Sequence, residues 1–306
     1  MTARGSAISL IVNRQRSGLR NSPPVNELMA TLERHGLRPE PILVERGSDP
    51  GEAARAALGR GAKTLVAAGG DGTISAVAST LLDSEAILGV LPIGTLNHFA
   101  KDLHIPLAIE DAARVLANGA VATIDVGEVN GHAFINNSSL GVYPQMVAWR
   151  EEYRREGWTK WTALFWAGVT ALRRMSFLRL RLTAADAEVA MLTPMIFIGN
   201  NEYEIEGFQA GSRRRIDAGR LFIYAVNAST PAKLIYISLL AWLGQLRQDR
   251  DFESLAVVEA WIETRRQWVK VSLDGEVARL EAPLHYRTRP AALRVMVPKK
   301  EIAFEP

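Results

Sequence analysis

Short apolar runs alternate with amphipathic stretches along the first 125 residues and predict strands that alternate with helices. Four runs bounded by turn residues have the length of buried strands, and they span residues 7–12, 41–44, 64–68 and 87–91. Residues 25–35 have helical periodicity and end at Gly36, Asp49 followed by Pro50 begins a second helix, and residues 74–82 predict a third. This order predicts a parallel sheet covered by helices, with ligands at the carboxyl ends of the strands.

The pattern changes after residue 125, where closely spaced strands predominate. Residues 128–134 predict a hairpin that turns at Asn130 and Gly131. Further strands are predicted at residues 177–182, 195–199, 221–226, 255–262, 268–273 and 293–297, with helical stretches near 145–175 and 232–247. We therefore expect an α/β domain at residues 1–125 and a mainly antiparallel β-sandwich at residues 126–306, whose last strand could return to the first domain.

Composition is that of a globular protein, because 48% of the 306 residues are hydrophobic. The net charge is only +3, but the basic residues are clustered, so an anionic partner would meet local patches. No nucleic-acid-binding motif is present, and we expect no nucleic-acid partner. The absence of cysteine excludes disulfides, thiolate metal sites and a cysteine nucleophile, and it fits a reducing compartment.

No apolar leader precedes the first predicted strand. The longest apolar runs, at residues 161–172 and 234–243, are too short to span a bilayer. We therefore expect a soluble cytoplasmic protein.

The strongest candidate for chemistry is Gly-Gly-Asp-Gly-Thr at residues 69–73, which follows a predicted strand and begins a predicted helix. Glycines at a helix N-terminus expose backbone N–H groups that can bind phosphate. Asp71 would repel a phosphate unless Mg²⁺ lies between them or the carboxylate handles a proton. A tight turn with Asp71 as the helix cap is the alternative interpretation. The lysine of a Walker loop and the third glycine of a dinucleotide fingerprint are both missing, which excludes those two classes.

Two further motifs contain candidate functional residues. Gly-Thr-Leu-Asn at residues 94–97 follows the fourth predicted strand, where Thr95 and Asn97 could hydrogen-bond a nucleotide or simply form a turn. Asp-Gly at residues 274–275 predicts a hairpin turn, and such a turn could also deliver Glu276 to a cleft.

These three motifs, in this order, resemble the lipid kinase family of diacylglycerol and sphingosine kinases, particularly its soluble bacterial members. The resemblance covers nearly the whole chain, because three further motifs also match. These are Asn-x-x-x-Ser-Gly at residues 13–18, Asn-Asn-Ser-Ser-Leu-Gly at 136–141 and Gly-Asn-Asn at 199–201. The resemblance implies a nucleotide-binding domain of the NAD kinase and phosphofructokinase type. It also implies that ATP and Mg²⁺ are used to phosphorylate a lipid hydroxyl, most readily that of diacylglycerol.

The resemblance also implies roles for individual residues. Glu276 would be the general base, Asp71 would position Mg²⁺ or act as a second acid, and Asp274 is grouped with them as a catalytic candidate. The implied ATP-binding residues are Asn13, Gly69, Gly70, Asp71, Gly72, Thr73, Ser75, Gly94, Thr95 and Asn97. Some bacterial members hold a structural Mg²⁺ where this chain has Asp217, but here Ala218 replaces a second acid.

Two other positions depart from the family pattern. Arg14 and an extra residue follow Asn13, where the family often has proline, and His98 stands where the family usually has aspartate. These departures leave two alternatives open. The first is an NAD kinase-like or other small-molecule kinase of the same superfamily, and the second is a nucleotide-gated lipid-binding protein that has lost turnover.

The stretch from residue 149 to 181 combines tryptophans with many basic residues. Its apolar residues fall at helical spacing, at Trp158, Trp161, Phe165, Val169 and Leu172. Such a stripe could pack in the core or contact an anionic membrane surface, and the arginines at 213–215 could add attraction for lipid headgroups. With the resemblance, we expect a lipid substrate and peripheral association with the inner face of the membrane, and a homodimer is a candidate assembly.

Overall fold

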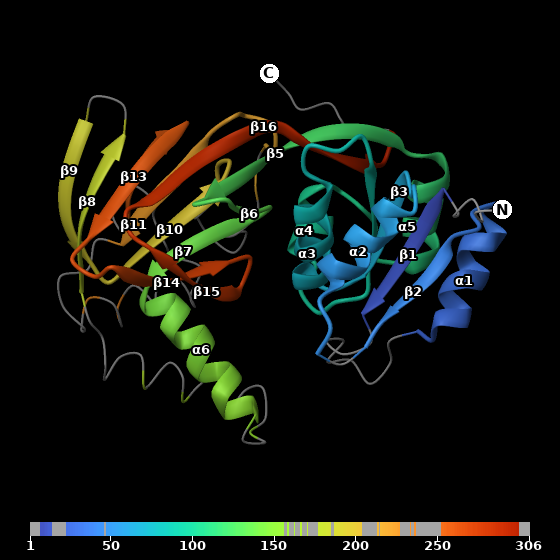
Figure 1. Cartoon of the computed structure of the whole chain (residues 1–306), viewed down its shortest axis with the longest axis horizontal. Helices are drawn as coiled ribbons and strands as arrows, with labels where there is room; N and C mark the ends of the chain where they lie inside the picture. Colours follow the sequence, from blue (N-terminus) through green and yellow to red (C-terminus); the bar gives the residue numbers. More distant parts are fainter. Residues whose placement is uncertain are drawn as a thin grey trace. The chain divides into compact units, whose positions relative to one another are not determined.

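The computed structural model describes residues 7–13, 23–45, 47–155, 177–184, 187–203, 215–226 and 252–299, with the single residues 158, 162, 166, 170, 213, 233 and 236. The chain divides into two compact units: residues 1–126, 215–217 and 290–306 form one, and residues 127–214 and 218–289 form the other. Figure 1 labels the elements of both units.

Among the described residues, six strands and five helices lie wholly or mainly within the first unit. Its strands are β1 (Ile8–Asn13), β2 (Glu40–Val44), β3 (Thr64–Gly69), β4 (Ile87–Pro92) and the start of β5 (Ala120–Val129). Its helices are α1 (Val25–Arg34), α2 (Pro50–Gly59), α3 (Asp71–Leu81), α4 (His98–Asp102) and α5 (Ile109–Asn118). The long strand β16 (Leu284–Val297) also enters this unit.

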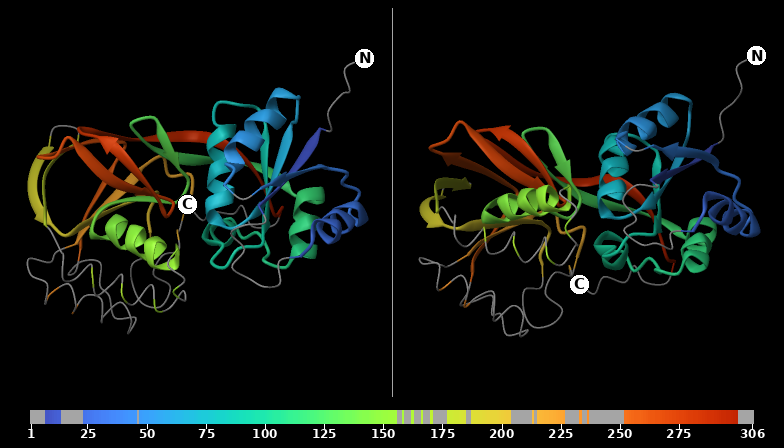
Figure 2. Two further views of the ribbon diagram at one scale, coloured as in Figure 1. Left: turned by 60° about the horizontal axis from the view of Figure 1, so that its bottom comes forward. Right: turned by 90° about the horizontal axis from the view of Figure 1, so that it is seen from below.

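The sheet of the first unit runs in the order β2-β1-β3-β4-β16, and all neighbouring pairs along this path are parallel. Helix α2 packs against α3 and helix α1 against α5, with the sheet between the two pairs (Figure 2). On the neighbouring strands β1, β3 and β4, Leu10, Leu65 and Leu88 are fully buried. The predicted α/β fold with a parallel sheet is therefore confirmed.

Local signals account for the helix boundaries. Asp49 caps α2, because its Oδ1 accepts a hydrogen bond from the N–H of Gly51 at 2.9 Å, and Pro50 occupies the first helical position. Helix α1 is followed by Gly36 at a φ of +80°, a left-handed conformation that favours glycine. Helix α5 was not predicted, although its buried residues Ala112, Ala113 and Leu116 lie on one face.

The second unit is built mainly from antiparallel strands. Its remaining elements are β6 (His132–Phe134), β7 (Asn137–Gly141), α6 (Val142–Arg155), β8 (Leu178–Ala184), β9 (Ala187–Thr193), β10 (Met195–Asn200), β11 (Leu221–Val226), β12 (Phe252–Val257), β13 (Glu259–Thr264), β14 (Trp268–Leu273) and β15 (Glu276–Glu281). One sheet has the order β12-β11-β10-β7-β14-β15. The sheet that contains β13, β8 and β9 shares a core with it, in which Leu140, Ile198 and Tyr286 are buried. The predicted antiparallel β-rich domain is confirmed.

The hairpin predicted at residues 128–134 is also confirmed. Strands β5 and β6 pair in antiparallel register, and both Asn130 and Gly131 have positive φ, at 46° and 81°.

The single strand predicted at residues 255–262 is wrong. Val258, which is 59% exposed, separates β12 from β13. Strand β12 pairs with β11 in one sheet, whereas β13 pairs with β16 and β8 in the other. Apart from Glu259, the run is apolar on both sides of Val258, so its composition does not reveal where the chain passes from one sheet to the other.

The predicted helical stretch near residues 145–175 overlaps α6, but most of its later part, including Trp161, Phe165, Val169 and Leu172, lies outside the described residues. The stretch 232–247 is likewise outside them, apart from Lys233 and Tyr236. Among the helices that the structure describes, none combines the length and the apolar character needed to cross a bilayer.

Candidate active site

Three strands that carry or precede predicted site residues end side by side at the carboxyl edge of the first unit's sheet. Strands β1, β3 and β4 are neighbours in the sheet and end at Asn13, Gly69 and Pro92. The Nδ2 of Asn13 donates a hydrogen bond to the Oγ1 of Thr73 at 3.1 Å, and both side chains are buried. This bond ties the end of β1 to the first turn of α3.

The glycine loops after β3 and β4 touch each other through their backbones. A Cβ atom added to Gly94 would lie 2.4 Å from the Cα of Gly70 and 2.7 Å from the Oδ1 of Asn97. A Cβ atom on Gly69 would lie 2.5 Å from the Cβ of Thr73. Both positions therefore require glycine for close approach.

Asn97 holds its own loop together. It has a left-handed φ of 51°, and its side chain is buried. Its Oδ1 accepts from the N–H of Gly94 at 3.0 Å, while its Nδ2 donates to the carbonyl oxygens of Gly94 at 3.1 Å and Pro92 at 3.3 Å. Thr95 is exposed at the tip of this loop. Asn97 thus fixes the loop conformation, and the loop presents Thr95 and Leu96 to solvent.

Asp71 is the first residue of α3, and Gly70 occupies the cap position, so the alternative interpretation of Asp71 as the helix cap is wrong. The Oδ1 of Asp71 accepts a hydrogen bond from the N–H of Phe99 in α4 at 3.1 Å. This bond orients the carboxylate and links the two glycine loops a second time. Gly72 and Ser75, which are partly exposed, follow in the first turns of α3.

Asp274 and Glu276 lie on the β14–β15 hairpin of the second unit. The predicted Asp-Gly turn is confirmed, because Asp274 and Gly275 both have positive φ, at 48° and 85°. Glu276 is the first residue of β15, and it is exposed.

The carboxylate of Asp274 binds the backbone that leads into β7. Its Oδ2 accepts from the N–H of Ile135 at 2.9 Å, and its Oδ1 accepts from the N–H groups of Asn136 and Asn137 at 2.8 Å and 3.0 Å. Such charge-assisted bonds are among the stronger hydrogen bonds of proteins. Asp274 therefore positions the turn that carries Glu276.

Arg213 binds the same segment from its carbonyl side. Its Nη1 donates to the carbonyl oxygen of Ile135 at 2.7 Å and to that of Asn200 at 3.2 Å, and its Nη2 donates to the Oδ1 of Asn136 at 3.1 Å. Arg213 is only 7% exposed, and its guanidinium lies over the ring of Tyr203. The expectation that Arg213 attracts lipid headgroups is wrong, since its guanidinium is committed to this buried network. Arg214 lies outside the described residues.

Two buried tyrosines complete the polar interior of the second unit. Burial raises the pKa of Tyr224 to about 12, and its hydroxyl accepts a hydrogen bond from the N–H of Tyr203 at 3.0 Å. Burial also raises the pKa of Tyr286 above its usual range, and its hydroxyl pairs with that of Ser138 at 2.9 Å. Both stay protonated at neutral pH and act in packing and hydrogen bonding.

The loop at Asp217 belongs to the first unit and does not fit a divalent ion. The Nε of Arg215 donates to the Oδ1 of Asp217 at 3.1 Å, and a neighbouring guanidinium opposes cation binding. Throughout the part of the chain that the structure describes, no group of three or more His, Asp or Glu side chains is placed to hold a metal ion.

The predicted site residues thus form two groups. Asn13, the residues from Gly69 to Ser75 and the residues from Gly94 to Asn97 lie together in the first unit, whereas Asp274 and Glu276 lie in the second. Sequence reasoning missed the backbone N–H of Phe99 and the guanidinium of Arg213 as parts of these groups. The arginine had appeared only as one of three consecutive basic residues.

Comparison with models of protein families finds a match over the first part of the chain. The model of the diacylglycerol kinase catalytic domain matches residues 7–129. A diacylglycerol kinase of Staphylococcus haemolyticus (strain JCSC1435) is 28% identical over 222 residues, which are 72% of this chain and 67% of that protein. A probable lipid kinase, YegS-like, of Yersinia pestis (strain Pestoides F) is 36% identical over 137 residues. That second match spans 43% of this chain and 45% of the Yersinia protein.

Solved structures with the same fold come from Bacillus anthracis str. Sterne. A putative diacylglycerol kinase from this organism superposes with a TM-score of 0.73 at 18% identity, covering 95% of this chain and 96% of that chain. A further structure of a putative diacylglycerol kinase gives a TM-score of 0.72 at 18% identity, with 96% and 98% covered. At this identity the likeness establishes the fold of both units and not the choice of substrate.

Proposed function

We propose that the chain is a member of the diacylglycerol kinase family of lipid kinases and that it transfers the γ-phosphoryl group of ATP to a hydroxyl of diacylglycerol or a related lipid. The observation that carries this proposal is the contact between two glycine loops at Gly70 and Gly94, beside the oriented carboxylate of Asp71. Glycines let the backbone approach a triphosphate closely, and the start of α3 favours its negative charge.

In this proposal the phosphates lie against the loop from Gly69 to Ser75, and Thr95 contacts the nucleotide from the second loop. Asn13 and Asn97 act indirectly. Both side chains are buried, and each is bonded inside the loops that it supports. We therefore assign them to positioning these loops.

Magnesium would enter with the nucleotide. Mg²⁺ is commonly held by one or two carboxylates together with substrate phosphates, and Asp71 provides one carboxylate whose Oδ1 is already oriented by Phe99. When bound there, the ion would neutralise charge on the phosphate oxygens. We propose no second magnesium site at Asp217, because Arg215 is paired with it.

In the chemical step, the acceptor hydroxyl oxygen forms a bond to the γ-phosphorus. The bond between that phosphorus and the bridging oxygen breaks, ADP leaves, and the hydroxyl proton passes to the carboxylate of Glu276. Asp274 supports this role by fixing the turn immediately before Glu276.

We further propose that the protein is cytoplasmic and contacts the anionic inner face of the membrane, because its acceptor lies in a bilayer. Trp158 and Trp166, each 42% exposed, support this contact, since tryptophan is enriched at membrane interfaces. Assembly as a homodimer is a separate proposal, and light scattering on the purified protein tests it.

The substrate assignment is tested by incubating the protein with labelled ATP and Mg²⁺. Diacylglycerol in mixed micelles is supplied in one reaction and NAD in another. We expect label only in a lipid phosphate. Label in NAD(P) would replace the lipid kinase assignment by an NAD kinase, and ATP binding without transfer to any lipid of a panel would indicate a nucleotide-gated binding protein.

The role of Glu276 is tested by Glu276→Gln. We expect the rate of transfer to fall by at least about a hundredfold, as for the loss of a general base, while ATP binding is retained. Glu281→Gln, at the other end of β15, is the matched control and should leave the rate unchanged. If both variants transfer phosphate at the parental rate, Glu276 is not the base.

A further inference from the structure

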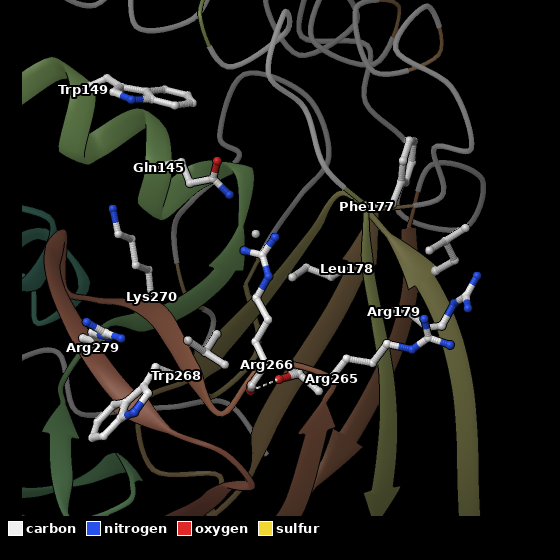
Figure 3. A pocket seen from close by; sticks show the side chains of 14 residues that line it. Gln145, Trp149, Phe177, Leu178, Arg179, Arg265, Arg266, Trp268, Lys270 and Arg279 are labelled. Atoms are coloured by element: carbon white, nitrogen blue, oxygen red, sulfur yellow. Dashed lines mark hydrogen bonds between the residues drawn. The ribbon is translucent and has the colours of Figure 1, made fainter.

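A large basic pocket opens in the second unit, separate from the hairpin residues Asp274 and Glu276. It has a volume of about 840 Å³ and lies between α6, the first residues of β8, the loop from β13 to β14, and strands β14 and β15. Figure 3 shows its lining, with Trp149 on the α6 side and Trp268 on the β14 side.

Five cationic side chains from four segments line this pocket, namely Arg179, Arg265, Arg266, Lys270 and Arg279. All five are exposed, and no aspartate or glutamate is among the described lining residues. Like charges gathered without counterions repel one another, so this arrangement costs stability unless an anion is present.

The contrast with a neighbouring arginine shows that the lack of ion pairs is particular to the pocket. Arg181, two residues after Arg179 on β8, forms an ion pair with Glu188 at 3.0 Å. Within the described part of the chain, none of the five pocket cations forms an ion pair. Arg279 lies instead over the ring of Trp268, at 5.2 Å from its centroid. The pocket therefore concentrates unneutralised positive charge.

The apolar residues that line the pocket favour a phospholipid over a small inorganic anion. Trp268 is 45% exposed and Leu192 is 57% exposed, so large apolar surfaces stand beside the cations. A small inorganic anion would leave these surfaces in water and fill little of the volume. A phospholipid would place its phosphate among the cations and its glycerol and upper acyl region against the tryptophan, as at membrane interfaces.

We propose that this pocket is a docking site for the phosphate headgroup of an anionic membrane phospholipid, distinct from the lipid that accepts the phosphoryl group. The inference rests on the proposed function only in that the acceptor lies in the same membrane. Occupation of the pocket holds the second unit at the bilayer surface, where the acceptor is found.

The test is sedimentation of the full chain with vesicles of phosphatidylcholine alone or with added phosphatidylglycerol. We expect binding only to the anionic vesicles, and weaker binding at high salt. Each cation near an anionic surface contributes roughly fivefold to binding, so Lys270→Gln with Arg279→Gln should weaken binding about 25-fold. The control pair, Arg114→Gln with Arg181→Gln, removes the same charge outside the pocket and should weaken it much less.

A second variant pair, Arg265→Gln with Arg266→Gln, tests the same pocket from the β13–β14 loop and should also weaken binding about 25-fold. If both pocket pairs bind anionic vesicles as tightly as the control pair, the proposal is overturned.

Titration of the parent with inorganic phosphate, followed by tryptophan fluorescence, separates a lipid from a soluble ligand. We expect no saturable change. A saturable change that is absent from the pocket variants would assign the site to a soluble phosphate compound and overturn the lipid assignment. Vesicle binding needs no ATP, so the result does not depend on whether the chain transfers phosphate to diacylglycerol.

Discussion

Gly94 cannot accept a side chain, because the Cα of Gly70 occupies the space that a Cβ would fill. Its backbone φ lies outside the left-handed range, so the restriction comes from a contact and not from the local conformation. The same loop depends on Asn97, whose amide bonds to both the N–H and the carbonyl of Gly94. At this scale the candidate site is a set of close backbone contacts with few exposed side chains.

We expect Gly94→Ala to lower the free energy of unfolding by about 1–3 kcal/mol, because an overpacked contact must be relieved by moving backbone. ATP affinity should fall as well, since the two loops move apart. Chemical denaturation and nucleotide titration measure the two effects.

Gly59→Ala is the control. Nothing lies within 4 Å of its added Cβ, and Gly59 is the last residue of helix α2, so stability should stay equal or rise. Equal ATP affinity in parent and Gly94→Ala would show that loop contact is not needed for binding.

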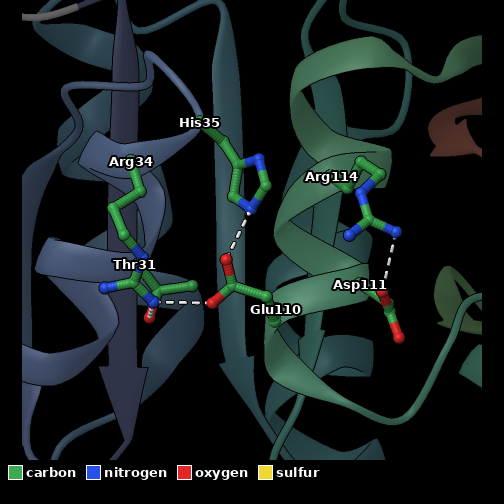
Figure 4. A network of polar contacts seen from close by, with 6 residues as sticks. All are labelled: Thr31, Arg34, His35, Glu110, Asp111 and Arg114. Atoms are coloured by element: carbon green, nitrogen blue, oxygen red, sulfur yellow. Dashed lines mark hydrogen bonds and ion pairs between the residues drawn. The ribbon is translucent and has the colours of Figure 1, made fainter.

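At the scale of secondary-structure elements, a single carboxylate links helices α1 and α5. It belongs to Glu110, in the first turn of α5 (Figure 4). The Nη2 of Arg34 lies 2.6 Å from Glu110 Oε2, and the Nε2 of His35 lies 2.9 Å from Oε1. The hydrogen bond from Arg34 is the main cause that lowers the pKa of Glu110, and the bond from His35 adds to it. The two residues that end α1 thus hold the start of α5.

The lowered pKa of Glu110 predicts a pH dependence of stability. A carboxyl group with a lowered pKa in the folded state stabilises the fold fully above its ordinary pKa, and this contribution is lost as the pH falls through the lowered pKa. Glu110→Gln should therefore remove part of the acid-induced loss of stability. Asp111→Asn, whose ion pair with Arg114 lies within α5, is the control and should retain that part. Thermal unfolding across the acid range checks both, and identical profiles for parent and Glu110→Gln would contradict the prediction.

At the scale of the whole molecule, the late strand β16 completes the parallel sheet that the first strands of the chain form. Strand β16 pairs with β13 through residues 284–287 and with β4 through Arg294 and Val295. Leu293, Val295 and Val297 are buried in the first unit, together with the strands that carry the glycine loops. The stability of the candidate nucleotide site therefore depends on residues far downstream of it.

We expect Leu293→Ala to destabilise the first unit by about 2–5 kcal/mol, because it removes a fully buried side chain and leaves a cavity. Urea denaturation measures the loss, and ATP binding should fail at a lower urea concentration than in the parent. Lys299→Ala, an exposed position just after β16, should change stability by less than about 0.5 kcal/mol. A parental unfolding midpoint for Leu293→Ala would show that β16 is dispensable to this sheet.

The sequence alone determined those features that depend on a few consecutive residues. The alternation of strands and helices, the Asp49 cap, the turns at Asn130-Gly131 and Asp274-Gly275, and the glycine loop after β3 follow from periodicity, capping and the freedom of glycine. These are local preferences of the chain, and they hold in any fold that uses them.

Only the tertiary structure decided which distant groups meet. The carboxylate of Asp274 binds backbone N–H groups 137–139 positions earlier, and Arg213 is buried against that same segment. Periodicity cannot reveal such pairings, because they depend on strand order and register. For the same reason, the division at Val258 and the basic pocket, which gathers residues from separate strands, could not be predicted from the pattern of apolar positions.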